Sequence, residues 1–162
     1  MGIDLVVPFE AGPVPDGFEI RAVHPAEDLP AIHVVLDAAS ADDWGYHPDA
    51  FERWADDHRT SPTFDPTLWL LAGEGGVPIG ALTANVFGDR GWVGELGVLP
   101  THRGRGVGAA LPRRSFATFA ERGLGRVMLN VDAENPTGAT ALYERAGMRV
   151  IKRWTLWERS SP

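Results

Sequence analysis

Hydrophobic and polar residues alternate over several short stretches of the chain. LWLLA (68–72) and PIGALTANVF (78–87) are separated by a turn that contains EGG, which is typical of a hairpin between two strands. WVGELGVL (92–99) continues the alternation after a second glycine turn, and RVMLNVD (126–132) repeats it further on. Two stretches nearer the ends also predict strands: FEIRAVH (18–24) and MRVIKRWTLWER (148–159).

Elsewhere, apolar residues recur every three or four positions, which predicts four helices. These helices cover residues 25–40, 49–59, 106–122 and 135–147. The last one has clear end signals, because Asn135 can cap it, Pro136 fits the first turn, and Gly147 suits the residue after its end.

The predicted order of elements is therefore β α α β β β α β α β. Strands that first form hairpins and then alternate with helices predict an α/β fold, with a mixed sheet and helices on its faces. We expect this fold to form a single domain over residues 18–162. Residues 1–17 contain three prolines and three glycines without any periodicity, so we expect an irregular N-terminal arm there.

Composition narrows the function. The chain has 162 residues and no cysteine, which excludes disulfides and cysteine catalysis. It has no basic leader and no run of about 20 apolar residues, so we expect a cytoplasmic protein without a membrane partner. The net charge of −7 argues against nucleic acid. This charge is divided as −11 over residues 1–66 and +4 over the remainder, which suits a cationic ligand at the front half and a polyanion at the back, or two solvated surfaces that differ.

The stretch GVLPTHRGRGVGAALPRR (97–114) lies between a predicted strand and a predicted helix. Three of its glycines, Gly104, Gly106 and Gly108, alternate with other residues. Unpaired N–H groups at a helix N-terminus attract anions, and glycines let an anion approach the backbone. Because Arg103 and Arg105 add positive charge, the stretch predicts a site for an oxygen-rich anion such as pyrophosphate.

Three other interpretations of this stretch are weaker. A P-loop requires a lysine that is missing here. A dinucleotide-binding turn gains support from Asp132 at the end of the next strand, but its glycine spacing is one residue longer than the spacing in this chain. A glycine-rich turn with surface arginines would carry no ligand at all.

The segment RGRGVG (103–108) resembles the Arg/Gln-x-x-Gly-x-Gly/Ala signature of the GNAT superfamily of N-acetyltransferases. GELGVLP before it and LNVDAENPTGATALYERAGM after it extend the resemblance over about residues 67–151. Parts of residues 64–100 also look like one half of the tandem mycothiol synthase family. The resemblance implies a three-layer fold with a mostly antiparallel sheet, in which WVGELGVL and RVMLNVD form a splayed parallel pair that holds acetyl-CoA.

By the same resemblance, the backbone of Gly97, Val98 and Leu99 would pair with the pantetheine arm of the cofactor. Asn135 matches an asparagine near the cofactor, although it can equally serve as a plain helix cap. The backbone N–H groups of seven consecutive residues would hold the pyrophosphate. These residues are Arg103, Gly104, Arg105, Gly106, Val107, Gly108 and Ala109.

Tyr143 matches the tyrosine that protonates the departing CoA thiolate in many members, although a buried core tyrosine would fit the same pattern. The N–H of Val98 could stabilise the oxyanion. The general base is where the chain departs from the family, because Asn130 stands where some members have glutamate. Glu95 is the nearest alternative if a bulge re-aims it, and Glu134 is another. A reactive amine could also do without a base.

We therefore expect acetyl transfer from acetyl-CoA to a primary amine of a small molecule or protein, by direct attack in a ternary complex. The stretch SADDWGYHPDAFERW (40–54) offers acids and aromatic rings that suit a cationic acceptor. Its candidate residues are Asp42, Asp43, Trp44, Tyr46, His47 and Trp54. The five histidines show no metal-ligand spacing, so we expect no metal.

Two further possibilities remain open from the sequence. The chain could be a GNAT-like domain that binds acyl-CoA without catalysis, acting as a sensor or as half of a tandem enzyme. The final predicted strand carries Trp154 and Trp157, which makes it a candidate surface for a homodimer.

Overall fold

The computed structural model describes residues 1–162 apart from 6–8, 44, 133–137 and 154–162. The strands are β1 (Gly2–Asp4), β2 (Phe18–Ala22), β3 (Leu70–Glu74), β4 (Val77–Phe87), β5 (Arg90–Val98) and β6 (Arg126–Met128). The helices are α1 (Leu29–Ser40), α2 (Phe51–Arg59), α3 (Val107–Glu121) and α4 (Ala139–Arg145), with short 3₁₀ turns η1 (Pro66–Leu68) and η2 (Pro100–His102).

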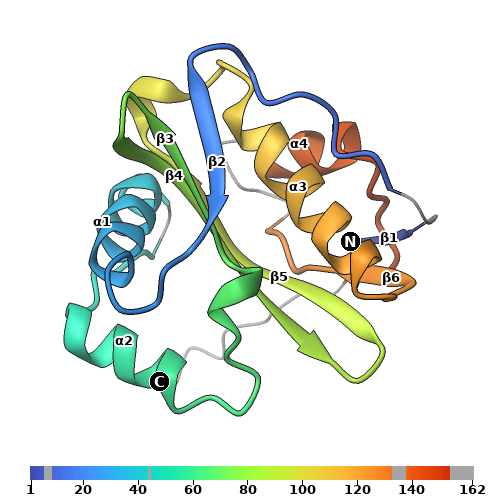
Figure 1. The fold of residues 1–162 in the computed structure, drawn as a ribbon, viewed down its shortest axis with the longest axis horizontal. Helices are drawn as coiled ribbons and strands as arrows, with labels where there is room; N and C mark the ends of the chain where they lie inside the picture. The colour runs from blue at the N-terminus through green and yellow to red at the C-terminus, as the bar shows by residue number, and fades with distance from the viewer. Residues whose placement is uncertain (6–8, 44, 133–137, 154–162) are drawn as a thin grey trace, which may run out of the picture.

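The strands form one sheet in the order β1-β6-β5-β4-β3-β2. All neighbours are antiparallel except β5 and β6, which run parallel. Helices α1 and α2 lie on one side of the sheet, and α3 and α4 lie on the other (Figure 1). The expected three-layer fold, with a mostly antiparallel sheet and one parallel pair, is confirmed.

Each of the two main helices buries its apolar face against the sheet. Helix α1 buries Ile32, Val35 and Leu36, and α3 buries Phe116 and Phe119. Their apolar residues recur at helical spacing, so burial of one face supplies most of the stability that such short helices lack alone. Apolar helix faces therefore cover the sheet on both sides.

The hairpin between β3 and β4 turns through two glycines. Gly75 and Gly76 have φ angles of 58° and 81°, in the left-handed region that other residues rarely adopt. A tight turn with two positive φ angles matches the twist of the flanking strands. The EGG sequence therefore predicted the hairpin correctly.

A β-bulge in β5 changes the face on which its side chains lie. A Cβ atom on Gly91 would lie 2.7 Å from a ring of α3, whereas one on Gly97 would lie 2.7 Å from a methyl group of α1. In a regular strand these two residues would share a face, because they are an even number apart. Val93 pairs with Ala84 of β4 and Leu96 pairs with Leu82, so β5 has one residue more than β4 between these two pairs. The bulge thus leaves Glu95 and Gly97 on the side of α1 and α2.

The expectation that residues 1–17 are irregular throughout is wrong for their first part. Strand β1 pairs antiparallel with β6, from Gly2 opposite Met128 to Asp4 opposite Arg126. Met1 and Leu5 are buried, but their alternation with polar residues covers too few positions to predict a strand. The strand with which β1 pairs is more than a hundred positions away in the sequence.

Two other boundaries differ from the sequence pattern. Strand β6 ends at Met128, although the alternation continued to residue 132. Of the final predicted strand, Arg149 forms an isolated bridge with Gly2, and residues 154–159 lie outside the described residues. No helix in the described ranges is long and apolar enough to cross a membrane.

Candidate active site

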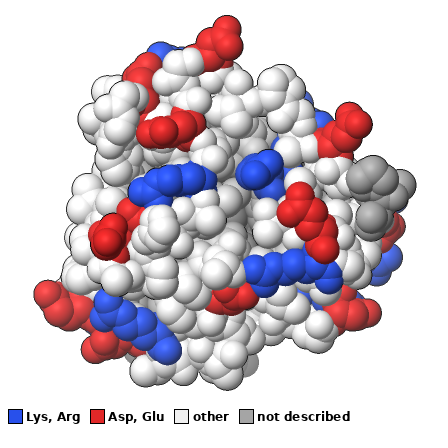
Figure 2. Space-filling model, in the orientation of Figure 1, with Lys and Arg blue, Asp and Glu red and all other residues white. Residues whose placement is uncertain are grey.

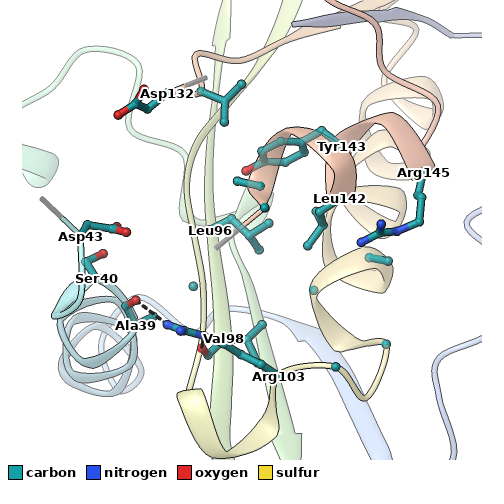
Figure 3. Close-up of a pocket in the computed structure, with 18 of the residues that line it drawn as sticks. Ala39, Ser40, Asp43, Leu96, Val98, Arg103, Asp132, Leu142, Tyr143 and Arg145 are labelled. Carbon is teal, nitrogen blue, oxygen red and sulfur yellow. Dashed lines mark hydrogen bonds between the residues drawn. The ribbon is translucent and has the colours of Figure 1, made fainter. Parts of the chain in front are cut away.

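A cleft opens where β5 and β6 separate. The two strands pair only from Arg90 opposite Arg126 to Trp92 opposite Met128, and β5 then continues to Val98 paired with β4 but not with β6. The cleft has a volume of about 640 Å³. Its walls come from β5, the loop before α3, α4, the end of α1 and the residues after β6 (Figure 3). The expected residues among its lining are Gly97, Val98, Arg103, Gly104, Gly106, Gly108, Ala109 and Tyr143.

The backbone of β5 directs its peptide groups in two directions. The N–H of Leu99 donates to the carbonyl of Ile79 in the neighbouring β4 region at 2.9 Å, so this residue faces away from the cleft. Alternate residues of an antiparallel strand point to opposite edges, so the peptide groups of Val98 face the cleft. The Nε of Arg103 donates to the Val98 carbonyl at 3.3 Å from that side, which agrees.

The opposite wall continues from the end of β6. The N–H of Leu129 donates to the Met1 carbonyl at 3.0 Å, and the carbonyl of Leu129 accepts from the Met1 ammonium at 2.7 Å. Both peptide groups of Leu129 therefore face β1. Asn130 and Asp132 line the cleft beyond it. The two parallel strands therefore offer polar groups on both sides of the gap.

The loop before α3 carries a row of unpaired donors. Gly104 and Gly106 have φ angles of 74° and 91°, which glycine alone adopts without strain. Within the described residues, the structure gives no hydrogen-bond partner to the N–H groups from Gly104 to Gly108. These groups precede or open α3, where the helix dipole is positive. A Cβ atom on Gly108 would lie 2.9 Å from Leu142 of α4, so the loop and α4 approach closely. This arrangement can hold an anion.

The side chains of the two loop arginines have other partners. Arg103 lines the cleft, but one guanidinium nitrogen donates to the Ala39 carbonyl at 2.7 Å, at the end of α1. Arg105 turns away and forms a double hydrogen bond with Glu74 at 2.6 and 3.2 Å. Val107 is 1% exposed and packs in the core. The expectation that both arginines add positive charge at the anion site is wrong for Arg105, whose charge is paired with Glu74. Arg103 lines the cleft, and its hydrogen bonds to neutral carbonyls leave its charge there.

Tyr143 lies on α4 with its ring almost fully buried and its hydroxyl directed into the cleft beside Leu96 (Figure 3). Burial raises the pKa of this phenol to about 12. The hydroxyl therefore keeps its proton at neutral pH. The ring of Tyr143 lies in the core, and its oxygen reaches the cleft. Tyr143 therefore has the expected position on the cleft and is at the same time a core tyrosine.

Glu95 lies next to the cleft but is not part of its lining. Its N–H donates to the hydroxyl of Thr83 at 2.9 Å, at the bulge. Its carboxylate is 3.6 Å from Nε2 of His58 on α2. His58 itself packs against the rings of Trp54 and Trp69, with centroids 4.6 and 4.8 Å away. The carboxylate of Glu95 thus faces the side of the sheet that carries α1 and α2.

Asp43, in the turn that follows α1, projects into the cleft opposite the α4 side (Figure 3). Its Oδ1 atom is shielded from solvent and has no hydrogen-bond partner among the described residues. An unpaired buried carboxylate oxygen is costly unless a ligand or water completes it. Asp43 is therefore suited to bind a cationic group.

The other acceptor candidates lie around this edge. The Tyr46 hydroxyl donates to Asp37, and burial, together with this carboxylate, raises the pKa of Tyr46 to about 12. Asp42 lies 3.9 Å from Arg103, and Trp54 packs in the aromatic cluster around His58. Trp44 lies outside the described residues.

Sequence reasoning missed Arg145, which lines the cleft from α4. It is an exposed residue for which the structure gives no ion pair within the described ranges. The signal was available, because helical spacing places residues 139, 142 and 145 along one face beside Tyr143. Asn135 and Glu134 lie outside the described residues, and no group of three metal-ligating side chains is found within them.

The comparisons with known proteins agree with this geometry. Residues 32–148 match the model of the acetyltransferase (GNAT) family. The chain belongs to the GNAT acetyltransferase family. A GCN5-related N-acetyltransferase structure from Sphaerobacter thermophilus is 37% identical, with a TM-score of 0.80, and the match covers 91% of this chain and 46% of that one. The sequence therefore identified the family correctly.

Curated relatives carry the name mycothiol acetyltransferase. One from Thermobispora bispora is 35% identical over 94% of this chain and 52% of its own length, and one from Salinispora tropica is 38% identical over 93% and 50%. The chain spans about half the length of these GNAT relatives. A GNAT structure from Brucella melitensis in complex with acetyl-CoA shares the fold at 24% identity, with a TM-score of 0.66, 82% of this chain and 83% of that one being covered.

Proposed function

We propose that this GNAT domain transfers an acetyl group from acetyl-CoA to a primary amine, with both substrates bound at once. One observation carries the proposal: the cleft between β5 and β6 has a row of unpartnered N–H groups at the start of α3 and the Tyr143 hydroxyl on its wall. Family membership supports the reaction class, and the acetyl-CoA complex of the Brucella melitensis protein supports the donor.

In this proposal the cofactor lies along the cleft. The N–H groups from Gly104 to Gly108 bind its diphosphate, because they have no partner among the described residues and lie at the positive end of a helix. The carbonyl of Val98, which also accepts from Arg103, accepts from a pantetheine amide N–H in the manner of an added strand. The guanidinium of Arg145 is placed to bind a phosphate at the cleft. Asn135 belongs to this site by the resemblance alone.

The reaction itself requires few groups. The amine attacks the thioester carbonyl, a C–N bond forms, and the C–S bond then breaks. The N–H of Val98 stabilises the oxyanion in between. The CoA thiolate leaves and takes a proton from Tyr143, whose phenol is protonated at neutral pH because its pKa is about 12.

The attacking amine must first lose a proton. For a lysine-like amine with a pKa of about 10.4, only a few molecules in ten thousand are neutral at pH 7. We assign this proton to Glu95, because it is a carboxylate beside the cleft on the α1 and α2 side of β5. Since Glu95 does not line the cleft itself, the proton reaches it through intervening water. The unpaired oxygen of Asp43 holds the ammonium before deprotonation. The name of the curated relatives puts mycothiol-related amines first among acceptors to be tried.

The decisive experiment is thiol release from acetyl-CoA over a panel of primary amines, comparing the wild type with Tyr143→Phe. We expect kcat to fall about a hundredfold with acetyl-CoA affinity unchanged, because a general acid contributes at least this much. Tyr46→Phe is the comparison, since it removes the same oxygen from a tyrosine on the acceptor side, held by Asp37; its effect should fall on the KM of the acceptor and not on kcat. Equal kcat in the wild type and Tyr143→Phe would contradict the role of Tyr143.

A second candidate is a domain that binds acyl-CoA without catalysis, as a sensor or as half of a tandem protein. Two observations favour it: the Glu95 carboxylate contacts His58 outside the cleft, and the chain spans about half of its curated relatives. Tight acetyl-CoA binding without thiol release on any amine would select this alternative. Failure to bind acetyl-CoA would exclude both.

A further inference from the structure

Glu74, the last residue of β3, is outside the cleft but binds two residues of the loop before α3. One carboxylate oxygen accepts from Arg105 at 2.6 Å. The other accepts from Arg105 at 3.2 Å and contacts Nε2 of His102 at 3.1 Å. The hydrogen bond from Arg105 is the largest of the causes that hold the pKa of Glu74 below its usual value. A single carboxylate therefore connects the sheet to both ends of the segment 102–105.

The Arg105 side chain is held by a second contact. Its guanidinium lies over the ring of Phe18, with 4.5 Å between the guanidinium carbon and the ring centroid. Phe18 pairs directly with Glu74 across β2 and β3, so the carboxylate and the ring come from adjoining positions of one sheet edge. The Arg105 side chain is thus fixed in a single direction, away from the cleft.

This attachment matters because the loop is rich in glycine. Gly104 and Gly106 flank Arg105, and both have positive φ angles. Glycines gain more freedom than other residues when unrestrained, and ordering them on binding costs affinity. Fixing Arg105 between them limits the directions of the neighbouring N–H groups before a ligand arrives.

We propose that Glu74 is a positioning residue for the cofactor, acting through Arg105 to orient the N–H groups that bind the diphosphate. The inference rests on the proposed function, since it takes the loop from Gly104 to Gly108 as the diphosphate site of acetyl-CoA. Glu74 itself touches neither the cleft nor the reacting atoms.

The test is Glu74→Gln, compared with Asp65→Asn. Asp65 forms a hydrogen-bonded ion pair with Arg122 at 2.7 Å, and its side chain is 38% exposed, against 36% for Glu74. The two substitutions thus remove similar surface ion pairs. We expect the KM for acetyl-CoA to rise about two- to fivefold in Glu74→Gln only, with kcat and the acceptor KM unchanged, since exposed pairs have modest effects.

Two further measurements separate positioning from a general loss of stability. S-acetylpantetheine lacks the diphosphate, so its KM should be the same in Glu74→Gln and the wild type. The double variant of Glu74→Gln with Arg105→Gln should be no worse than Arg105→Gln alone, because both changes break one interaction. A rise in KM for S-acetylpantetheine, or additive effects in the double variant, would overturn the proposal.

The outcomes distinguish this inference from the proposed function. If the wild type does not bind acetyl-CoA, the proposed function fails. If the wild type binds it and Glu74→Gln has the same KM as Asp65→Asn, the proposed function stands and the role of Glu74 is rejected.

Discussion

The two sides of the cleft are built from different parts of the chain and from different chemical groups. On the α3 and α4 side, the candidate anion site consists of backbone N–H groups opened by glycines. On the α1 and α2 side, the polar groups are side chains: the unpaired oxygen of Asp43, the Glu95 carboxylate beside His58, and the Tyr46 phenol bonded to Asp37.

This difference has a consequence for specificity. Backbone groups recognise a feature common to many ligands, such as a diphosphate, whatever the neighbouring side chains are. Side chains can change without altering the fold, so they can select one acceptor among many. The charge follows the same division, since residues 1–66 are strongly acidic and the remainder is slightly basic. On the face drawn in Figure 2, acidic and basic side chains are interspersed, which does not resemble the basic surface of a nucleic-acid-binding protein.

Among the changes that compare the two sides, the largest expected effect on binding comes from closing the backbone site. Gly106 and Gly123 lie at opposite ends of α3, with φ angles of 91° and 78°. Alanine at either position should cost about 1 kcal/mol of folding stability because of the positive φ. Only Gly106→Ala should also weaken acetyl-CoA binding, by about tenfold or more, because it distorts the N–H groups beside Pro15. Calorimetric titration and thermal unfolding measure the two quantities, and equal affinities would show that the loop is not the diphosphate site.

The next effect is expected on the side-chain half of the site, where a KM and not the folding stability should change. Asp43→Asn should raise the KM of a cationic acceptor about tenfold and leave the KM of acetyl-CoA unchanged, because a buried charge-assisted contact is lost. Asp42→Asn is the control. The carboxylate of Asp42 is 72% exposed, and its one ion pair among the described residues is a long contact of 3.9 Å with Arg103. Steady-state kinetics with both substrates varied would test this, and parallel changes in the two variants would exclude Asp43 as the acceptor contact.

The smallest expected effect is a change with salt in the pKa of one tyrosine but not of the other. Tyr46 and Tyr143 are the two tyrosines of the sequence. Both have a pKa raised from 10 to about 12, so the folded state favours the neutral phenol. Their contribution to stability is therefore complete below pH 10 and is lost as the pH rises toward 12. Burial alone raises the pKa of Tyr143, whereas for Tyr46 burial is joined by Asp37 and other carboxylates.

Salt should separate these causes. Added salt screens the carboxylates and should lower the pKa of Tyr46, while the pKa of Tyr143 stays the same. Phenolate absorbance can follow each tyrosine alone, Tyr46 in Tyr143→Phe and Tyr143 in Tyr46→Phe. An equal response to salt at the two positions would contradict the electrostatic difference between the two sides.

The sequence predicted what depends on local pattern. The hairpin at Gly75 and Gly76, the glycine loop before α3 and the helix with Tyr143 were identified, because turn residues and helical spacing act over a few positions. Features that depend on distant partners were missed. The arginines of the loop pair with Ala39 and Glu74, which come from elements far away in the chain.

The bulge in β5 illustrates the same limit. Alternation alone leaves the face of Glu95 undetermined, since it depends on where the register against β4 gains a residue. Strand β1 was missed because three residues carry too little pattern, and pairing with β6 decides their conformation. The candidate cofactor site was thus more predictable than the acceptor side.

Strand β1 also bears on the order in which the molecule can assemble. Its residues pair with Arg126–Met128, and Gly2 bridges to Arg149, so partners more than a hundred positions apart must meet. Contacts of such high sequence separation form late, because the loop between them must close first. We therefore expect the wall of the cleft that follows β6 to form late in folding, after most of the sheet is in place.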